Sequence, residues 1–107
     1  MKRRQQIQIN RFQLGTLLNG LEKEFLNCIM EDMVYCSHCK AMALKGIFVD
    51  KIYLTKLNDV KVFGICKACN TSVVRLFDFG KEEEFHQRAD KLRASIHNYT
   101  RVLSLQH

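Results

Sequence analysis

Four of the five cysteines in this 107-residue chain stand in two pairs, each with two residues between the sulfurs. The pairs are Cys36 with Cys39 and Cys66 with Cys69. Two intervening residues let one tight turn present both thiolates to the same ion, and zinc takes four such ligands in a tetrahedron. Because four protein ligands leave no position for water, we expect one structural zinc ion per chain. His38, inside the first pair, is the alternative ligand.

The paired cysteines resemble the two knuckles of the zinc-ribbon superfamily, in which each knuckle lies at the end of antiparallel strands and both grip one zinc ion. Members of this superfamily bind nucleic acid, RNA polymerases or other proteins, or stiffen a larger enzyme, so the resemblance alone selects no function. Lys40 and Asn70 stand where many members carry glycine after the second cysteine. The 26 residues from Lys40 to Ile65 exceed the usual interval and predict an extended hairpin.

The length and composition indicate one domain over residues 1–107. The basic start of the chain is not followed by an apolar run of signal-peptide length, and no stretch reaches the roughly 18 apolar residues of a membrane span. We therefore expect a cytoplasmic protein without a membrane partner. In a reducing compartment thiolate–metal bonds are favoured over disulfides. No Ser-His-Asp set, carboxylate pair, phosphate loop or open metal site is apparent, so we expect no enzymatic activity.

The net charge of +6 is concentrated in the middle of the chain. Residues 1–32 carry five basic and four acidic groups, residues 33–80 seven and three, and residues 81–107 five and four, which gives +1, +4 and +1. An anionic partner would be drawn first to the middle segment. Its candidate contacts are Lys51, Lys56, Lys61, Lys67 and Arg75, with Tyr53 or Phe63 available for stacking. The alternative is that these are ordinary solubilising side chains.

The predicted fold class is α+β, with a helix over about 11–32, a zinc ribbon over 33–80 and a helix over 81–105. Apolar residues with a four-three spacing mark one seam at Leu14, Leu18, Leu21, Phe25 and Cys28. The same spacing marks a second seam at Phe85, Ala89, Leu92, Ile96, Tyr99 and Leu103. We expect the seams to pack together as an antiparallel helical hairpin, which places Cys28 in the core. A homodimer through the seams is the alternative to a monomer.

The ribbon is predicted to be a small antiparallel sheet with strands over 41–49, 51–57, 60–65 and 71–79. Residues 6–9 alternate in polarity, which fits an edge strand or a frayed arm. Asn58 and Asp59 tolerate the positive φ of a tight turn. A hairpin closed by these two residues pairs Lys56 with Lys61. Two facing lysines repel each other unless an anionic ligand lies against them.

These observations favour a small regulatory protein that binds nucleic acid, or that is associated with transcription, through a basic zinc ribbon. The alternative is a protein-interaction adaptor that engages an acidic protein surface and uses its zinc only for structure. The salt dependence of binding distinguishes the two, because phosphate contacts give an affinity that falls log-linearly with salt.

Overall fold

The computed structural model describes the backbone of residues 4–105 and the side chains of residues 4–98. The fold is α+β, as the sequence predicts, and contains a four-stranded antiparallel sheet with strand order β1-β4-β5-β6 and a separate two-stranded sheet. The four strands are β1 (Ile7–Ile9), β4 (Ile47–Leu54), β5 (Val60–Cys66) and β6 (Ser72–Phe77). The small sheet pairs β2 (Tyr35–Cys36) with β3 (Ala41–Met42). Residues 6–9 thus contribute an edge strand.

The first helical stretch is divided into α1 (Arg11–Leu17) and α2 (Gly20–Asp32), so the prediction of one helix over 11–32 is wrong. The cause is local, because each helix starts with its own capping box. The side chain of Asn10 accepts from the backbone of Gln13, and that of Asn19 accepts from the backbone of Glu22. In each box the second residue's side chain also accepts from the backbone N–H of the capping asparagine.

The break between the helices changes which residues of α2 face the core. Leu26 and Ile29 are buried, whereas Leu21 is 77% exposed and Phe25 is 52% exposed. Cys28 is also exposed, which corrects the prediction that it lies in the core. Because the chain is extended at Leu18, the spacing of apolar residues in α1 does not continue into α2.

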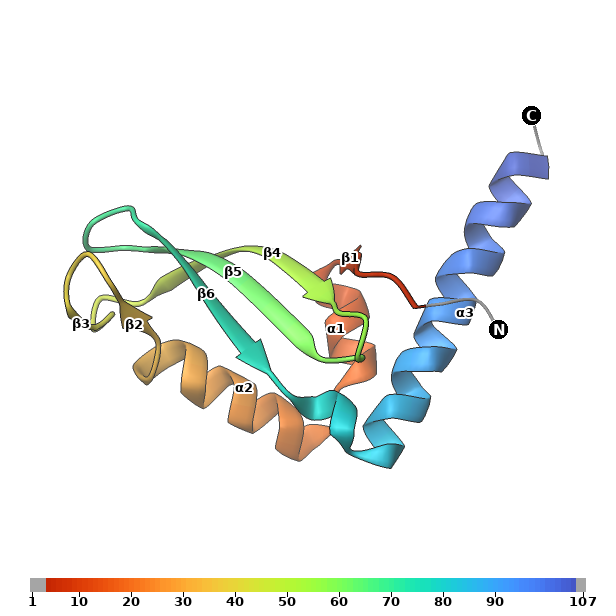
Figure 1. The fold of residues 1–107 in the computed structure, drawn as a ribbon, viewed down its shortest axis with the longest axis horizontal. Helices are drawn as coiled ribbons and strands as arrows, with labels where there is room; N and C mark the ends of the chain where they lie inside the picture. Colours follow the sequence, from red (N-terminus) through yellow and green to blue (C-terminus); the bar gives the residue numbers. More distant parts are fainter. Residues whose placement is uncertain (1–3, 106–107) are drawn as a thin grey trace.

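The helices α1 and α2 cover one face of the four-stranded sheet, and the other face is open (Figure 1). The core between them is a single cluster formed by apolar side chains of all these layers. Its sheet members are Ile9, Ile52, Leu54, Val60, Val62 and Phe77. Alternation along β5 places Val60, Val62 and Gly64 on the covered side and Lys61, Phe63 and Ile65 on the open side.

The pairing of β4 with β5 differs from the predicted register. Lys61 lies opposite Tyr53 rather than Lys56, and Lys56 belongs to the loop between the strands. The loop is five residues long, because the backbone N–H of Thr55 donates to Asp59 and that of Asn58 donates to Thr55. A β-bulge between Val49 and Lys51 shifts the register further along β4. The strand predicted over 41–49 is also interrupted, with Gly46 at φ +94°.

After a short 3₁₀ turn, η1 (Phe79–Lys81), the chain enters α3 (Glu83–Leu105), which runs away from the sheet (Figure 1). Phe85 and Ala89 are fully buried, and Leu92 and Ile96 pack against the same core, as the predicted seam requires. Tyr99 and Leu103 fall outside the described side chains. The predicted helical hairpin does not form, because α3 packs against α1 and leaves the body instead of lying along α2.

A polar clamp of Asn58, Asp90 and Arg93 attaches α3 to the β4–β5 loop. Asn58 has no exposed surface and adopts φ +64°. Its amide nitrogen donates to Asp90 Oδ1 at 3.0 Å, and its amide oxygen accepts from Arg93 Nε at 2.7 Å. Arg93 also donates to the backbone oxygen of Thr55, and Asp90 accepts two hydrogen bonds from Arg4. The loop therefore has one defined conformation against the helix.

Candidate metal centre

The two cysteine pairs lie in turns that meet at the end of the molecule away from α3 (Figure 1). The first pair, Cys36 and Cys39, spans the turn from β2 to β3. The second pair, Cys66 and Cys69, spans the turn from β5 to β6. Each pair is thus the tip of an antiparallel hairpin, and the zinc-ribbon-like arrangement expected from the spacing is present.

Both knuckles use the same backbone turn. The N–H of Lys40 donates to Cys36 O and the N–H of Asn70 donates to Cys66 O, each at 2.8 Å. Lys40 and Asn70 then adopt left-handed conformations with φ of +55° and +62°. Asparagine adopts this conformation readily and lysine less so. The matching geometry therefore indicates that the turn is held by its hydrogen bonds rather than by the residue type.

The four sulfurs are spaced as a tetrahedral metal site requires. Cys36 Sγ and Cys69 Sγ are 3.5 Å apart, Cys39 Sγ and Cys66 Sγ are 3.9 Å apart, and all four lie within 4.8 Å of one another. Zinc–sulfur bonds of about 2.3 Å in a tetrahedron place the sulfurs about 3.8 Å apart. The donor set and its spacing therefore fit a metal ion. His38 is exposed and is not a member of this cluster.

The surroundings of the cluster favour thiolate at one position. The hydroxyl of Thr71, assisted by its backbone N–H, donates to Cys69 and lowers the pKa of that thiol to about 6. Hydrogen bonding to Cys69 and partial desolvation raise the pKa of Cys39 to about 12. The thiol of Cys69 therefore loses its proton more readily than that of Cys39. Because thiolate is the form that binds metal, this arrangement prepares the site for a cation.

A small apolar shell separates the cluster from the main core. Cys36 and Cys66 are fully buried and pack with Val34, Ala43 and Val73. Cys39 is exposed, so the cluster is covered on its inner side and reaches solvent on its outer side. With four protein sulfurs around it, a tetrahedral ion has its coordination filled and serves the structure.

The five predicted anion contacts do not form one patch. Lys51 and Lys61 belong to the neighbouring strands β4 and β5. Lys51 pairs with Phe63 and Lys61 pairs with Tyr53, so both lysines lie on the open sheet face. Lys56 is exposed in the β4–β5 loop, and Lys67 lies in the second knuckle, where its backbone N–H donates to Gly46. Arg75 lies on the covered face. Its guanidinium is 5.9 Å from the Phe77 ring centroid, and its buried Nε has no hydrogen-bond partner among the described residues.

The open sheet face joins the two strand lysines to aromatic rings. Tyr53 and Phe63 are in edge-to-face contact with centroids 5.5 Å apart, and Lys61 Nζ lies 5.6 Å from the Phe63 centroid. Lys51 is paired directly with Phe63 across the strands. Sequence reasoning missed three further apolar residues of this face, each about half exposed: Phe48, Val74 and Leu76. Only the strand pairing and the bulge show that they lie on the same side.

Comparison with family models, with curated proteins and with solved structures finds no match to this chain. The likeness to zinc ribbons therefore rests on the cysteine spacing and on the geometry of the cluster. Within residues 4–105, no helix has both the length and the apolar character needed to cross a lipid bilayer.

Proposed function

We propose that this chain is a small regulatory protein that holds one structural zinc ion at the four-cysteine cluster and binds single-stranded nucleic acid across the open sheet face. The observation that best supports nucleic-acid binding is the contiguous block of Lys51, Tyr53, Lys61 and Phe63 on that face. Aromatic rings on a sheet provide stacking surfaces for unpaired bases, and flanking lysines neutralise phosphates. We propose no catalytic role for the metal.

Charge on the open face supports an anionic ligand. Neither Lys51 nor Lys61 forms an ion pair among the described residues. Asp50 lies at the bulge and lines the same shallow pocket as Lys51, Tyr53 and Phe63. Two unpaired cations beside one exposed carboxylate leave this part of the face basic.

The zinc ion would contribute by fixing the ends of β5 and β6. Cys66 ends β5, and the second knuckle leads directly into β6. With the metal bound, these strands keep the register that places Phe63 opposite Val74 and beside Lys51. Two of the cysteine ligands, Cys66 and Cys69, therefore belong to the same hairpin as Lys61 and Phe63 of the binding face.

A protein-interaction adaptor is the second candidate function. It is favoured by Phe48, Val74 and Leu76, because three half-exposed apolar side chains on one face suit a protein surface. An acidic patch on such a partner would face the same two lysines.

Fluorescence anisotropy with labelled single-stranded and duplex oligonucleotides tests the proposal on the zinc-loaded chain. Wild type should prefer the single strand, and the Lys51→Glu/Lys61→Glu variant should bind it weakly. Each phosphate contact contributes about 0.7 to the slope of log affinity against log salt for single strands, so loss of two lysines should reduce the slope by about 1.4. The control is Lys23→Glu/Lys91→Glu, which makes the same change in net charge on α2 and α3.

The Phe63→Ala variant separates stacking from charge. Removal of one stacking ring should cost about 1–3 kcal/mol of binding free energy with little change in the salt slope. If wild type shows no affinity for any oligonucleotide, nucleic-acid binding is refuted and the adaptor function takes its place. Equal loss of binding in the control pair and in the strand pair would show that general charge, rather than this face, is responsible.

A further inference from the structure

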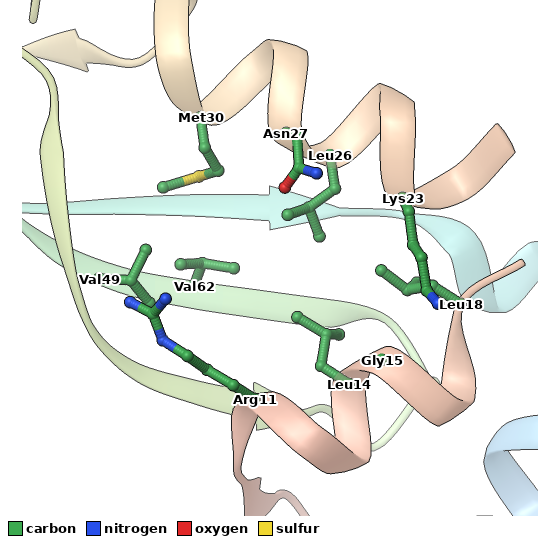
Figure 2. A pocket seen from close by; sticks show the side chains of 10 residues that line it. All are labelled: Arg11, Leu14, Gly15, Leu18, Lys23, Leu26, Asn27, Met30, Val49 and Val62. Atoms are coloured by element: carbon green, nitrogen blue, oxygen red, sulfur yellow. The ribbon is translucent and has the colours of Figure 1, made fainter. Parts of the chain in front are cut away.

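A cavity of about 280 Å³ lies on the covered side of the sheet, between α1, α2 and the strands β4 and β5 (Figure 2). We call it the helix–sheet cavity. Figure 2 shows Leu14 from α1, Leu26 from α2 and Val62 from β5 converging on it. Leu18, Met30 and Val49 complete its apolar lining. The walls are therefore suited to a hydrocarbon group.

The polar groups of the helix–sheet cavity are few and stand apart from one another. The amide of Asn27 reaches toward the hollow from α2, Arg11 lies at the end near Val49, and Lys23 lies near Leu18 (Figure 2). Neither Arg11 nor Lys23 forms an ion pair among the described residues. An apolar pocket with a small number of placed polar groups is the usual form of a small-molecule site.

A second, basic hollow adjoins this cavity. It has a volume of about 470 Å³ and shares Arg11, Asn27, Met30 and Val49 with the first as lining residues. We call it the basic cup, because Lys45 and Lys67 also line it. Glu31 is the one carboxylate in its lining, against three cations. No ion pair among the described residues involves any of these cations.

We propose that the two hollows form one binding site for a small anionic amphiphile, an acyl or alkyl chain that carries a phosphate or carboxylate head. The tail occupies the helix–sheet cavity and the head lies in the basic cup near Arg11, Lys45 and Lys67. Charge complementarity favours this orientation, because three cations line the basic cup, whereas Lys23 alone stands at the other end of the apolar slot. The helix–sheet cavity lies on the side of the sheet opposite the proposed nucleic-acid surface, so a tail bound there stabilises the fold without covering Lys51, Tyr53, Lys61 or Phe63.

Octyl phosphate and octanoate, below their micelle concentrations, are suitable probes, with inorganic phosphate and octanol as the two halves of the ligand. Isothermal titration of the zinc-loaded chain should give one site for at least one of the two amphiphiles. Inorganic phosphate should not bind measurably, and octanol should bind at least about tenfold more weakly, because it lacks the charge-assisted contacts. Comparison of the two amphiphiles distinguishes a phosphate head from a carboxylate head.

A matched pair of glycine variants tests the position of the tail. Gly15 lines the helix–sheet cavity, and a Cβ added there has no atom within 4 Å, so Gly15→Leu should place its side chain in the space that the tail would occupy. Gly20 has equal room but does not line the cavity, which makes Gly20→Leu the control. We expect Gly15→Leu to weaken binding at least about tenfold and Gly20→Leu to leave it within about twofold.

Charge variants test the position of the head and do not depend on repacking the core. Lys45→Gln and Lys67→Gln are surface changes, and each should weaken amphiphile binding about tenfold, whereas Lys56→Gln in the β4–β5 loop should not. Elemental analysis of each variant verifies that the metal content is unchanged, since Lys67 lies in the second knuckle.

Labelled methionine methyl groups provide a direct readout of where the probe binds. Met30 lines both hollows, while Met33 and Met42 line neither and serve as internal controls. The Met30 methyl resonance should shift on addition of the amphiphile, and the other two should stay in place. Absence of binding by both amphiphiles at millimolar concentration, equal binding by Gly15→Leu, or unchanged affinity in both lysine variants would overturn the proposal.

Discussion

Substitution of Asn58 tests whether the polar clamp contributes to stability. In the Asn58→Ala variant, Arg93 Nε loses its acceptor at 2.7 Å and Asp90 loses a donor at 3.0 Å. A partly buried charged group left without its partner costs about 2–3 kcal/mol. Alanine at φ +64° adds about 1 kcal/mol, because it lacks the short polar side chain whose local hydrogen bonds let asparagine adopt the left-handed region. We therefore expect the free energy of unfolding to fall by about 3–4 kcal/mol.

The Asn58→Gly variant separates the two contributions. It removes the same hydrogen bonds but accepts the positive φ, so its loss should be smaller by about 1 kcal/mol. Urea denaturation of the metal-loaded chain, followed by circular dichroism, measures both variants. Leu57→Ala in the same loop is the control, because Leu57 is 73% exposed and should change stability by less than about 0.5 kcal/mol. If Asn58→Ala and Asn58→Gly both lose less than about 1 kcal/mol, the clamp is not a stabilising element.

Three further predictions concern the metal, pH and the core. Cys66→Ser should abolish the binding of one metal ion per chain in elemental analysis and unfold the end of the molecule that holds the cysteines. The reason is that structural zinc contributes about 10 kcal/mol or more to the stability of small modules. A stably folded, metal-free wild type would contradict this prediction. The pKa of Asp90 is depressed by its hydrogen bonds from Arg4, so its contribution to stability is present above about pH 4 and is lost as the pH falls below that value. Acid titration should show a steeper loss in wild type than in Asp90→Asn, and parallel curves would argue against the ion pair. Phe85→Ala should cost about 3–5 kcal/mol in denaturant titrations because the ring is fully buried, whereas Leu21→Ala on the exposed side of α2 should cost little.

The metal cluster could be predicted from the sequence because its requirement is local. Two residues between the cysteines of each pair are enough to specify the turn, and four sulfurs are enough to specify the ion's geometry. The strands predicted over 60–65 and 71–79 are also present, although the second one ends at Phe77. In both cases short-range spacing determines the structure.

The sequence contains a signal for the break between α1 and α2, but the spacing of the apolar residues favours one continuous helix. Asn10 with Gln13 and Asn19 with Glu22 each follow the capping-box pattern of a polar cap and a partner three residues later. The second box lies inside the predicted helix, where a four-three repeat across it suggested continuity. Capping geometry decided the outcome, because Asn19 satisfies the first backbone donors of a new helix.

The hairpin register was not predictable from the two turn-forming residues alone. The hydroxyl of Thr55 accepts from the backbone N–H groups of Leu57 and Asp59, which stabilises a five-residue loop instead of a two-residue turn. This extension moves the partner of Lys61 to Tyr53. The expected repulsion between two lysines is thereby replaced by a lysine beside an aromatic pair, which depends on contacts between distant strands.

The bulge at Asp50 lets a single strand serve two separate cores. Ile47 packs in the cluster around the cysteines and Ile52 packs in the main core, yet an odd number of positions separates them. In a regular strand they would point to opposite faces. The unpaired residue at the bulge brings Ile47 and Ile52 back to the same face of the sheet. Each half of β4 therefore has its own register, which is determined at the cysteine end for one half and at the Asn58 loop for the other. The bulge therefore separates the registers of the two halves of β4. A register shift at one end of the strand does not have to invert the side chains at the other end.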